Sequence, residues 1–133
     1  MIGALDVSSS ALVAQRTRLD VIAGNIANAF TTQQEDGRIE PYRRRFTTFM
    51  TGDAEGGPGV HVSSVQEDHE SPFKMKYSPG DPSADANGMV QLPNVSITME
   101  YIDAMEASRA YEANAAMLNV TRNMVQQAIR LFA

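Results

Sequence analysis

The stretch that decides the fold is SITMEYIDAMEASRAYEANAAMLNVTRNMVQQAIRLF, residues 96–132. Its apolar side chains recur every seven positions, at Ile97, Ala104, Tyr111, Leu118, Val125 and Phe132. A repeat of seven places these side chains along one face of an α-helix. Pro93 precedes the stretch and Ser96 is a suitable N-cap, so the sequence predicts one helix over residues 96–132, roughly 54 Å long at 1.5 Å per residue.

A second apolar row runs along the opposite side of this helix. Ile97 and Met99 are separated by about 200° around the helix axis, because each residue advances the helix by about 100°. A helix with two opposed apolar sides cannot bury both against one shorter partner helix. Either the middle of the chain or other subunits must therefore cover the second row. Its members are Met99, Ile102, Ala113, Met117, Val120, Met124 and Leu131.

The N-terminal segment, residues 5–28, has a matching seven-residue repeat. Leu5, Leu12, Leu19 and Ile26 lie seven apart, and Ile22 lies on the same face. We expect this helix to pack antiparallel against the long C-terminal helix. The residues predicted to pack between the two helices are Leu12, Leu19, Ile22, Ile26, Leu118, Val125 and Ile129.

Residues 31–95 differ in character from the two helices. Stretches rich in Gly, Pro, Ser and Asp mark loops at 52–59 and 78–88. Alternating stretches predict three strands, at 42–50, 60–65 and 73–77.

The predicted fold class is α+β and mainly α. It combines an antiparallel, coiled-coil-like pair of long terminal helices with a small β-rich central insert. Residues 1–30 and 96–133 form the terminal-helix domain in this prediction, and residues 31–95 form the insert.

Composition argues against several classes of function. The net charge of −5 disfavours binding to nucleic acid, and the absence of cysteine removes thiolate sites. His61 and His69 have no second cluster of metal ligands, and residues 83–94 depart from a calcium loop at its first and last positions. No phosphate-binding loop or nucleophile motif is present. The sequence therefore predicts no enzyme activity, cofactor, metal, small-molecule substrate or nucleic-acid partner.

The sequence also predicts no insertion into a membrane. No apolar stretch is long enough to span a bilayer. The first residues lack the basic n-region and unbroken apolar h-region of a cleaved signal peptide. Taken alone, these features favour the cytoplasm.

Two polar features have more than one interpretation. On a strand, Arg44 faces away from Arg43 and Arg45, so these charges do not form one patch. An exposed strand edge or a contact with an acidic neighbour is favoured over nucleic-acid binding. Asn114 and Asn119 are either exposed polar positions of the long helix or amides buried between helices, where they fix the register.

Several short motifs resemble the flagellar axial proteins, the family of rod, hook and hook-associated subunits. Asn25-Ile26-Ala27-Asn28-Ala29, followed by Thr31-Thr32, resembles the N-terminal signature of the family, and Pro41-Tyr42-Arg43-Arg44 resembles the next segment of rod subunits. The C-terminal motifs resemble those of the proximal-rod members. The matching residues are Asn25, Ile26, Asn28, Thr31, Pro41, Tyr42, Arg43, Asn87, Gly88, Pro93, Asn94, Ser108, Arg109, Tyr111, Glu112 and Asn114.

This resemblance implies a structural subunit of the proximal rod in the bacterial flagellar basal body. Such subunits assemble through their terminal helices into a hollow helical tube that transmits torque and carries the export channel. The implied partners are copies of the chain itself, other rod subunits and the flagellar type III export apparatus. The implied location is the rod in the periplasmic space, reached without a cleaved signal peptide, in place of the cytoplasm.

On this interpretation the terminal-helix domain is the assembly domain. We assign part of the second apolar row to contacts between subunits, namely Met99, Ile102, Met117, Val120, Met124 and Leu131. The alternative is a helical adaptor module that binds one partner and does not polymerise.

Overall fold

The computed structural model describes residues 2–52 and 55–133. Met1, in the predicted terminal-helix domain, and Asp53 and Ala54, in the predicted loop at 52–59, lie outside the described residues. The chain forms two helices with strands between them. In order, the elements are α1 (Ile2–Ala27), β1 (Arg45–Thr51), β2 (Val60–Glu67), β3 (Lys74–Tyr77), β4 (Met89–Leu92) and α2 (Ile97–Phe132).

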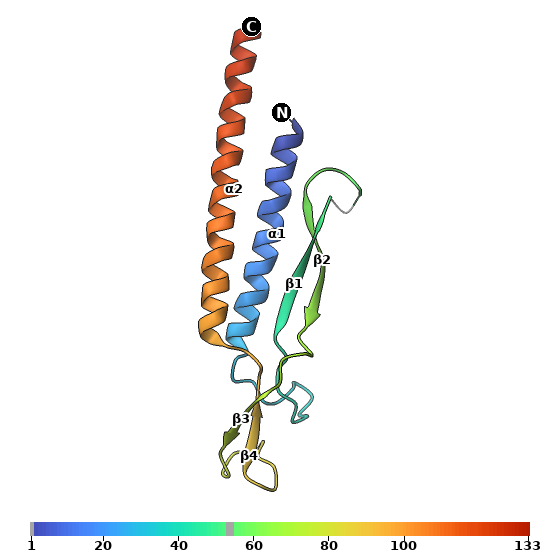
Figure 1. The fold of residues 1–133 in the computed structure, drawn as a ribbon, viewed down its shortest axis with the longest axis vertical. Helices are drawn as coiled ribbons and strands as arrows, with labels where there is room; N and C mark the ends of the chain where they lie inside the picture. Colours follow the sequence, from blue (N-terminus) through green and yellow to red (C-terminus); the bar gives the residue numbers. More distant parts are fainter. Residues whose placement is uncertain (1, 53–54) are drawn as a thin grey trace.

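The two terminal helices lie side by side and antiparallel, and the β segments lie between them in sequence (Figure 1). This arrangement confirms the predicted fold class. α1 ends where the Asn28 side-chain amide donates to the Gly24 carbonyl at 2.9 Å. α2 begins after Ser96, whose hydroxyl oxygen accepts from the Met99 amide at 3.5 Å. The Gly24 carbonyl also accepts from the Asn28 backbone amide at 3.1 Å, whereas Ser96 caps an amide of the first turn of α2 that has no partner within the helix.

The β segments form two separate two-stranded ribbons, in contrast to the three strands that we predicted. β1 pairs antiparallel with β2, with an irregularity between Thr48 and Phe49, and β3 pairs antiparallel with β4. The sequence analysis missed β4 because this strand has only four residues and follows the predicted loop at 78–88 directly. β1 also begins at Arg45, three residues later than predicted, and the side chains of Tyr42 and Arg44 before it bond to Asn25 in α1 and Glu100 in α2.

The β1–β2 ribbon lies along α1 and is attached to it near both ends. The Asn25 side chain bonds to the backbone of Arg45, and the Ser10 hydroxyl accepts from the Val60 amide at 3.1 Å. Ser10 and Asn25 are separated by roughly 22 Å along a helix, and a seven-residue strand spans about 23 Å. The lengths match, so the ribbon runs straight beside the helix. Gly59 permits the close approach, because a Cβ atom there would collide with Ser10.

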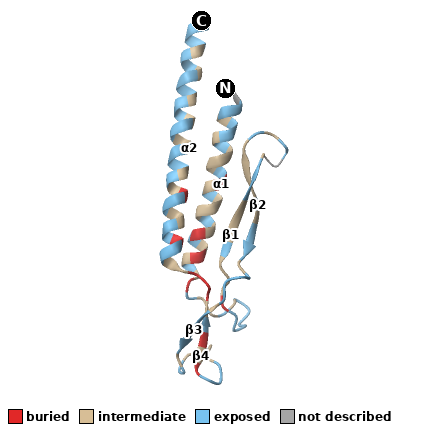
Figure 2. Ribbon diagram, viewed as in Figure 1, coloured by how far each residue is buried: buried red, intermediate tan, exposed pale blue. Residues whose placement is uncertain are grey.

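Burial is concentrated where α1 ends and α2 begins, and the far ends of both helices are exposed (Figure 2). The buried apolar residues are Ala14, Ile22, Ala29, Val90, Val95 and Ala107. Three buried polar residues accompany them, Asn25, Asn94 and Glu100. The accessible surface is 9001 Å², whereas a compact monomer of 14.5 kDa exposes about 6,900 Å². The chain is therefore extended, with little core of its own.

Candidate assembly interface and polar joint

A cluster of polar side chains joins α1, β1 and α2, and we call it the polar joint. Its members are Asn25, Tyr42, Arg44, Asn94 and Glu100. Asn25 is fully buried, and its side-chain amide donates to the Arg45 carbonyl at 2.8 Å and to the Glu100 carboxylate at 3.1 Å. Its carbonyl oxygen accepts from the Arg45 amide at 2.9 Å and from the Tyr42 hydroxyl at 3.0 Å. Asn25 thereby uses its full hydrogen-bonding capacity.

Glu100 supplies the buried charge of the polar joint. It lies in the first turn of α2 with no exposed surface, and its carboxylate accepts from Asn25 and from the Arg44 guanidinium at 2.5 Å. The same guanidinium lies 3.4 Å from Asp103, one turn further along α2. The positive end of the helix dipole also favours a carboxylate at this position. The buried carboxylate is therefore paired and hydrogen-bonded, as a buried charge must be.

Asn94 completes the polar joint from the segment before α2. Its side-chain oxygen accepts from the Arg44 amide at 2.8 Å, and its amide group donates to the carbonyls of Asp68 and Ser71 at 3.0 and 3.1 Å. Hydrogen bonds from Ser71, with a smaller contribution from the Glu70 amide, lower the pKa of Asp68. The backbone at the start of β1 is therefore bonded to two asparagines: the Arg45 amide donates to Asn25 of α1, and the Arg44 amide donates to Asn94 before α2.

Tyr42 is the titratable hydroxyl of the polar joint. Burial raises the pKa of the Tyr42 phenol, the Arg45 charge lowers it, and Glu100 and Glu67 raise it further. The net direction is upward, so the folded chain favours the neutral phenol. A neutral phenol retains the proton that it donates to Asn25.

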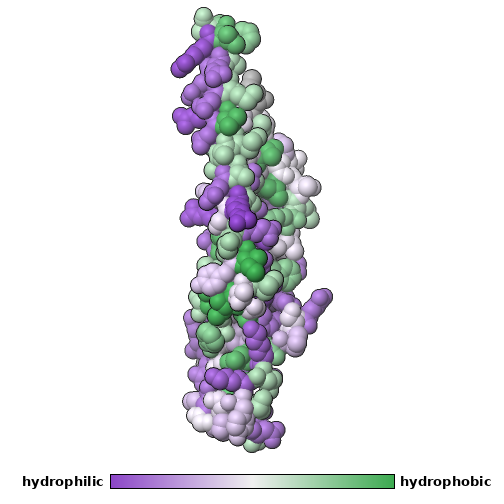
Figure 3. Space-filling model, turned by 60° about the vertical axis from the view of Figure 1, so that its left-hand side comes forward, coloured by the Kyte–Doolittle hydropathy of each residue, from purple (hydrophilic) through white to green (hydrophobic). Residues whose placement is uncertain are grey.

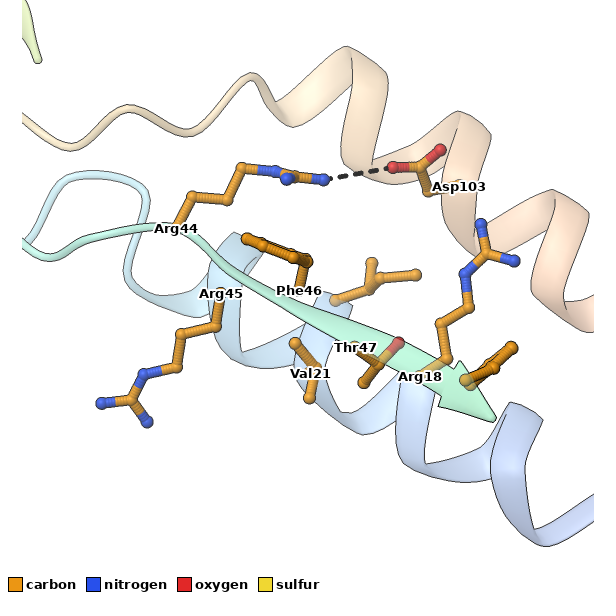
Figure 4. A pocket seen from close by; sticks show the side chains of 9 residues that line it. Arg18, Val21, Arg44, Arg45, Phe46, Thr47 and Asp103 are labelled. Carbon is orange, nitrogen blue, oxygen red and sulfur yellow. Dashed lines mark hydrogen bonds and ion pairs between the residues drawn. The ribbon is translucent and has the colours of Figure 1, made fainter. Parts of the chain in front are cut away.

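A small pocket opens beside the polar joint, between α1, β1 and α2 (Figure 4). Its volume is about 230 Å³, which is below the 300–1,000 Å³ of typical ligand pockets. Val21 and Phe46 line it together with Arg18 and Arg44, and the Arg44 guanidinium points toward Asp103. Apolar side chains and an arginine that is already paired fit a structural role for this pocket better than a ligand site.

The predicted helix-pair residues divide into two groups. Ile22 is buried, and Leu12, Leu19, Ile26 and Leu118 are half-buried. Asn25 lies opposite Glu100 in the antiparallel pair, so counting along both helices places Ile2 level with Asn123. By this count Val125 and Ile129 stand past Ile2, where Val125 is half-buried and Ile129 is 62% exposed. Their packing between the two helices stays a prediction.

The residues assigned to contacts between subunits are all exposed in the isolated chain. Half or more of the surface remains exposed on Met99, Ile102, Met117, Val120, Met124 and Leu131. A view turned toward the α2 side shows hydrophobic surface at several heights along the molecule (Figure 3). Monomeric soluble proteins rarely expose large contiguous apolar patches, so this row is a candidate contact surface.

The free end of α2 adds to this surface. α2 has 36 residues and α1 has 26, so α2 extends roughly 15 Å beyond its partner. We call residues 124–132 the overhang. Leu131 and Phe132 in the overhang are 86% and 92% exposed. Among residues 2–52 and 55–133, no other helix or strand lies beside this part of α2 (Figure 1).

Apart from Arg43, which lies over the Phe73 ring, the motif residues fall into three places. Several lie in or next to the polar joint, namely Asn25, Ile26, Asn28, Thr31, Pro41, Tyr42, Pro93 and Asn94. Asn87 and Gly88 form the turn before β4, where Gly88 has a φ of 77°. The others lie on α2, namely Ser108, Arg109, Tyr111, Glu112 and Asn114.

Two uncertain features of the sequence also have a place in the structure. Of the arginine run, Arg44 contacts Glu100 and Asp103, Arg45 lies 3.7 Å from Glu67, and Arg43 lies over the Phe73 ring. Arg44 and Arg45 therefore have acidic neighbours, one of the two alternatives, whereas Arg43 contacts an aromatic ring. Asn114 is half-buried and donates to the Ala110 carbonyl of its own helix at 2.8 Å, whereas Asn119 is exposed.

Sequence reasoning missed the roles of Glu100 and Arg44. In the sequence, Glu100 belongs to none of the quoted motifs, and Arg44 is one of three strand charges. The signal that could have found them is the neighbouring motif residue Asn25, which is a poor choice for a helix interior unless its amide has partners. No metal site emerges among residues 2–52 and 55–133, and no helix in these ranges is long and apolar enough to cross a membrane.

Comparison with known proteins gives consistent matches at both ends of the chain. The family described as "Flagella basal body rod protein" matches residues 5–33, and "Flagellar basal body rod FlgEFG protein C-terminal" matches residues 86–131.

Whole relatives match over nearly the full length. The flagellar basal-body rod protein FlgC of Bacillus subtilis is 40% identical, over 96% of this chain and 95% of its own. FlgC of Salmonella typhimurium is 41% identical, over 98% and 97%. FlgC of Borreliella burgdorferi is 38% identical, over 98% of this chain and 97% of its own.

Proposed function

Because this chain belongs to the FlgC family of flagellar basal-body rod proteins, we propose that its long helix α2 is the surface through which subunits of the rod pack against one another. The family is structural, so the chain is a subunit of the proximal rod and not an enzyme. The observation that carries the proposal is the exposed apolar row on α2, from Met99 to Leu131.

Burial of this row supplies a physical reason for assembly. Each large apolar side chain that leaves water stabilises a contact by about 1.5–3 kcal/mol. A row of six such residues along a rigid helix gives a long, narrow contact, which suits helices packed side by side in the wall of a tube. The proposed partners are copies of this chain and other rod subunits.

The remaining parts of the proposal concern how the subunit reaches and serves the rod. The assembled subunits form a hollow helical tube that transmits torque and surrounds the export channel. The chain passes through the flagellar type III export apparatus without cleavage of a signal peptide. Residues 1–30 and 96–133 act as the assembly domain, and residues 31–95 act as the insert. An extended shape with two long helices and little core supports this division.

The test replaces two apolar side chains of the row without adding charge. Met124→Gln combined with Leu131→Gln should abolish rod formation in a strain that lacks the native gene, whereas export of the chain should continue. The matched control is Asn123→Gln combined with Arg130→Gln, two exposed positions displaced by one residue. Intact basal bodies in the apolar variant would refute the proposal. A defined small oligomer that needs the row, with rods unaffected by its loss, would support the adaptor alternative.

A further inference from the structure

The apolar repeat of the helix pair does not by itself define one register. Leu5, Leu12, Leu19 and Ile26 lie seven residues apart in α1, and Ala104, Tyr111 and Leu118 lie seven apart in α2. A shift of one helix by seven residues, about 10 Å, brings equivalent apolar side chains back to the same places. The buried residues of this pair include alanines, Ala14 and Ala107, which interlock less specifically than large side chains.

Polar contacts distinguish the registers more sharply. Among residues 2–52 and 55–133, two side-chain contacts of this kind connect α1 with α2. Arg18 lies 3.7 Å from Glu106, whose side chain is 69% exposed, and an exposed ion pair of this kind contributes little. Asn25 and Glu100 are hydrogen-bonded at 3.1 Å, and neither has exposed surface. A shift by seven residues would leave the Glu100 carboxylate without both Asn25 and Arg44.

We propose that Glu100, through Asn25 and Arg44, selects the register of the helix pair and contributes little net stability. Removal of two charges from water costs about as much as their pairing returns, so an apolar pair of similar size is often as stable as a buried ion pair. An unpaired buried charge, in contrast, is strongly unfavourable. The ion pair therefore acts mainly against the shifted arrangements, in which Glu100 has no partner.

The register determines the length of the overhang. In the observed register α2 extends roughly 15 Å beyond α1, and a shift of seven residues changes this by about 10 Å. The exposed apolar row would then stand at a different height relative to the β1–β2 ribbon, which is attached to α1 at Ser10 and Asn25. This consequence for assembly rests on the proposed function, whereas the selection of the register does not.

Distance measurement between two spin labels tests the register directly. The chain has no cysteine, so Ala23→Cys and Asn123→Cys place single labels at exposed positions on α1 and α2. The labelled full-length chain is compared with the same chain carrying Glu100→Met and Arg44→Met. The matched control carries Glu106→Met and Arg18→Met, the same substitutions at the exposed ion pair.

The original chain and the control should give one distance. The variant of the polar joint should add a second population shifted by about 10 Å, with Tm within about 5 °C of the original. A single unshifted distance in that variant would overturn the proposal. Loss of the folded state would also overturn it, because the ion pair would then be a stability element. A shifted variant that still builds rods would leave the register role intact and refute the proposed function of the overhang.

Discussion

The two ends of α2 are built in opposite ways. At its start, near β1, a carboxylate is fully buried between hydrogen-bond partners from two other segments, Asn25 in α1 and Arg44 before β1. At its far end, in the overhang, Leu131 and Phe132 are almost fully exposed. A globular monomer reverses this distribution, with charges outside and large apolar side chains inside. On the proposed function, the polar end defines the geometry of the subunit and neighbouring subunits cover the apolar end.

The comparison predicts that monomer stability resides near the polar joint. Glu100→Ala should have the largest effect, because it leaves the Arg44 guanidinium and the Asn25 amide facing a cavity. Loss of one partner of a buried ion pair costs about 3–5 kcal/mol, measurable by urea unfolding of the purified chain. Glu106→Ala is the matched control at an exposed pair, and it should change the free energy of unfolding by less than about 1 kcal/mol. Equal losses in the two variants would contradict the comparison.

The second prediction concerns the amide of Asn25. Asn25→Asp keeps the shape of the side chain but removes the donor that bonds to the Arg45 carbonyl and to Glu100. An unsatisfied buried group costs about 1–3 kcal/mol, and a second carboxylate beside Glu100 adds repulsion. Asn119→Asp makes the same change at an exposed position of α2 and should be nearly neutral. A stable Asn25→Asp chain would show that the polar joint tolerates rearrangement.

The sequence predicts the two helices and the exposed apolar row of α2, but it does not predict the polar joint. The seven-residue repeats predicted both helices, and the second row on α2 predicted the exposed face, because periodicity is a local property of the chain. The polar joint depends on contacts between residues 25, 44, 94 and 100, whose proximity follows from the tertiary structure. Strand β4 was too short to give a periodic signal.

A smaller effect is expected from Tyr42→Phe. The substitution removes one hydrogen bond to Asn25, whose oxygen still accepts from the Arg45 amide, so the cost is about 1 kcal/mol. Because the pKa of the Tyr42 phenol is raised in the folded chain, the unfolded chain loses its proton first as pH rises past about 10. The free energy of unfolding of the original chain should therefore decrease above that pH. The part of this decrease that comes from Tyr42 should be absent in the Tyr42→Phe variant. Tyr77→Phe, at a tyrosine 67% exposed, is the control for both measurements. If the free energy of unfolding depended on pH equally in the two variants, the Tyr42 phenol would make no contribution to the stability of the polar joint.

The smallest effect on the monomer, and the sharpest test of the apolar end, is expected from Met117→Glu. Met117 is 57% exposed, and Val120 and Met124 lie three and seven residues further along the same row. In the isolated chain a carboxylate at this position faces water, so the thermal melt should stay within about 2 °C of the original. In the rod the same carboxylate would be buried without a partner, at a cost of several kcal/mol for each repeated contact, and rod formation should fail. Asn119→Glu adds the same charge two residues away on another side of the helix, and it should leave more rods intact. A lowered melting temperature would place Met117 within the monomer's own packing. An unchanged melt together with normal rods would mean that this row faces neither the subunit nor its neighbours, and the contrast between the two ends of α2 would lose its functional meaning.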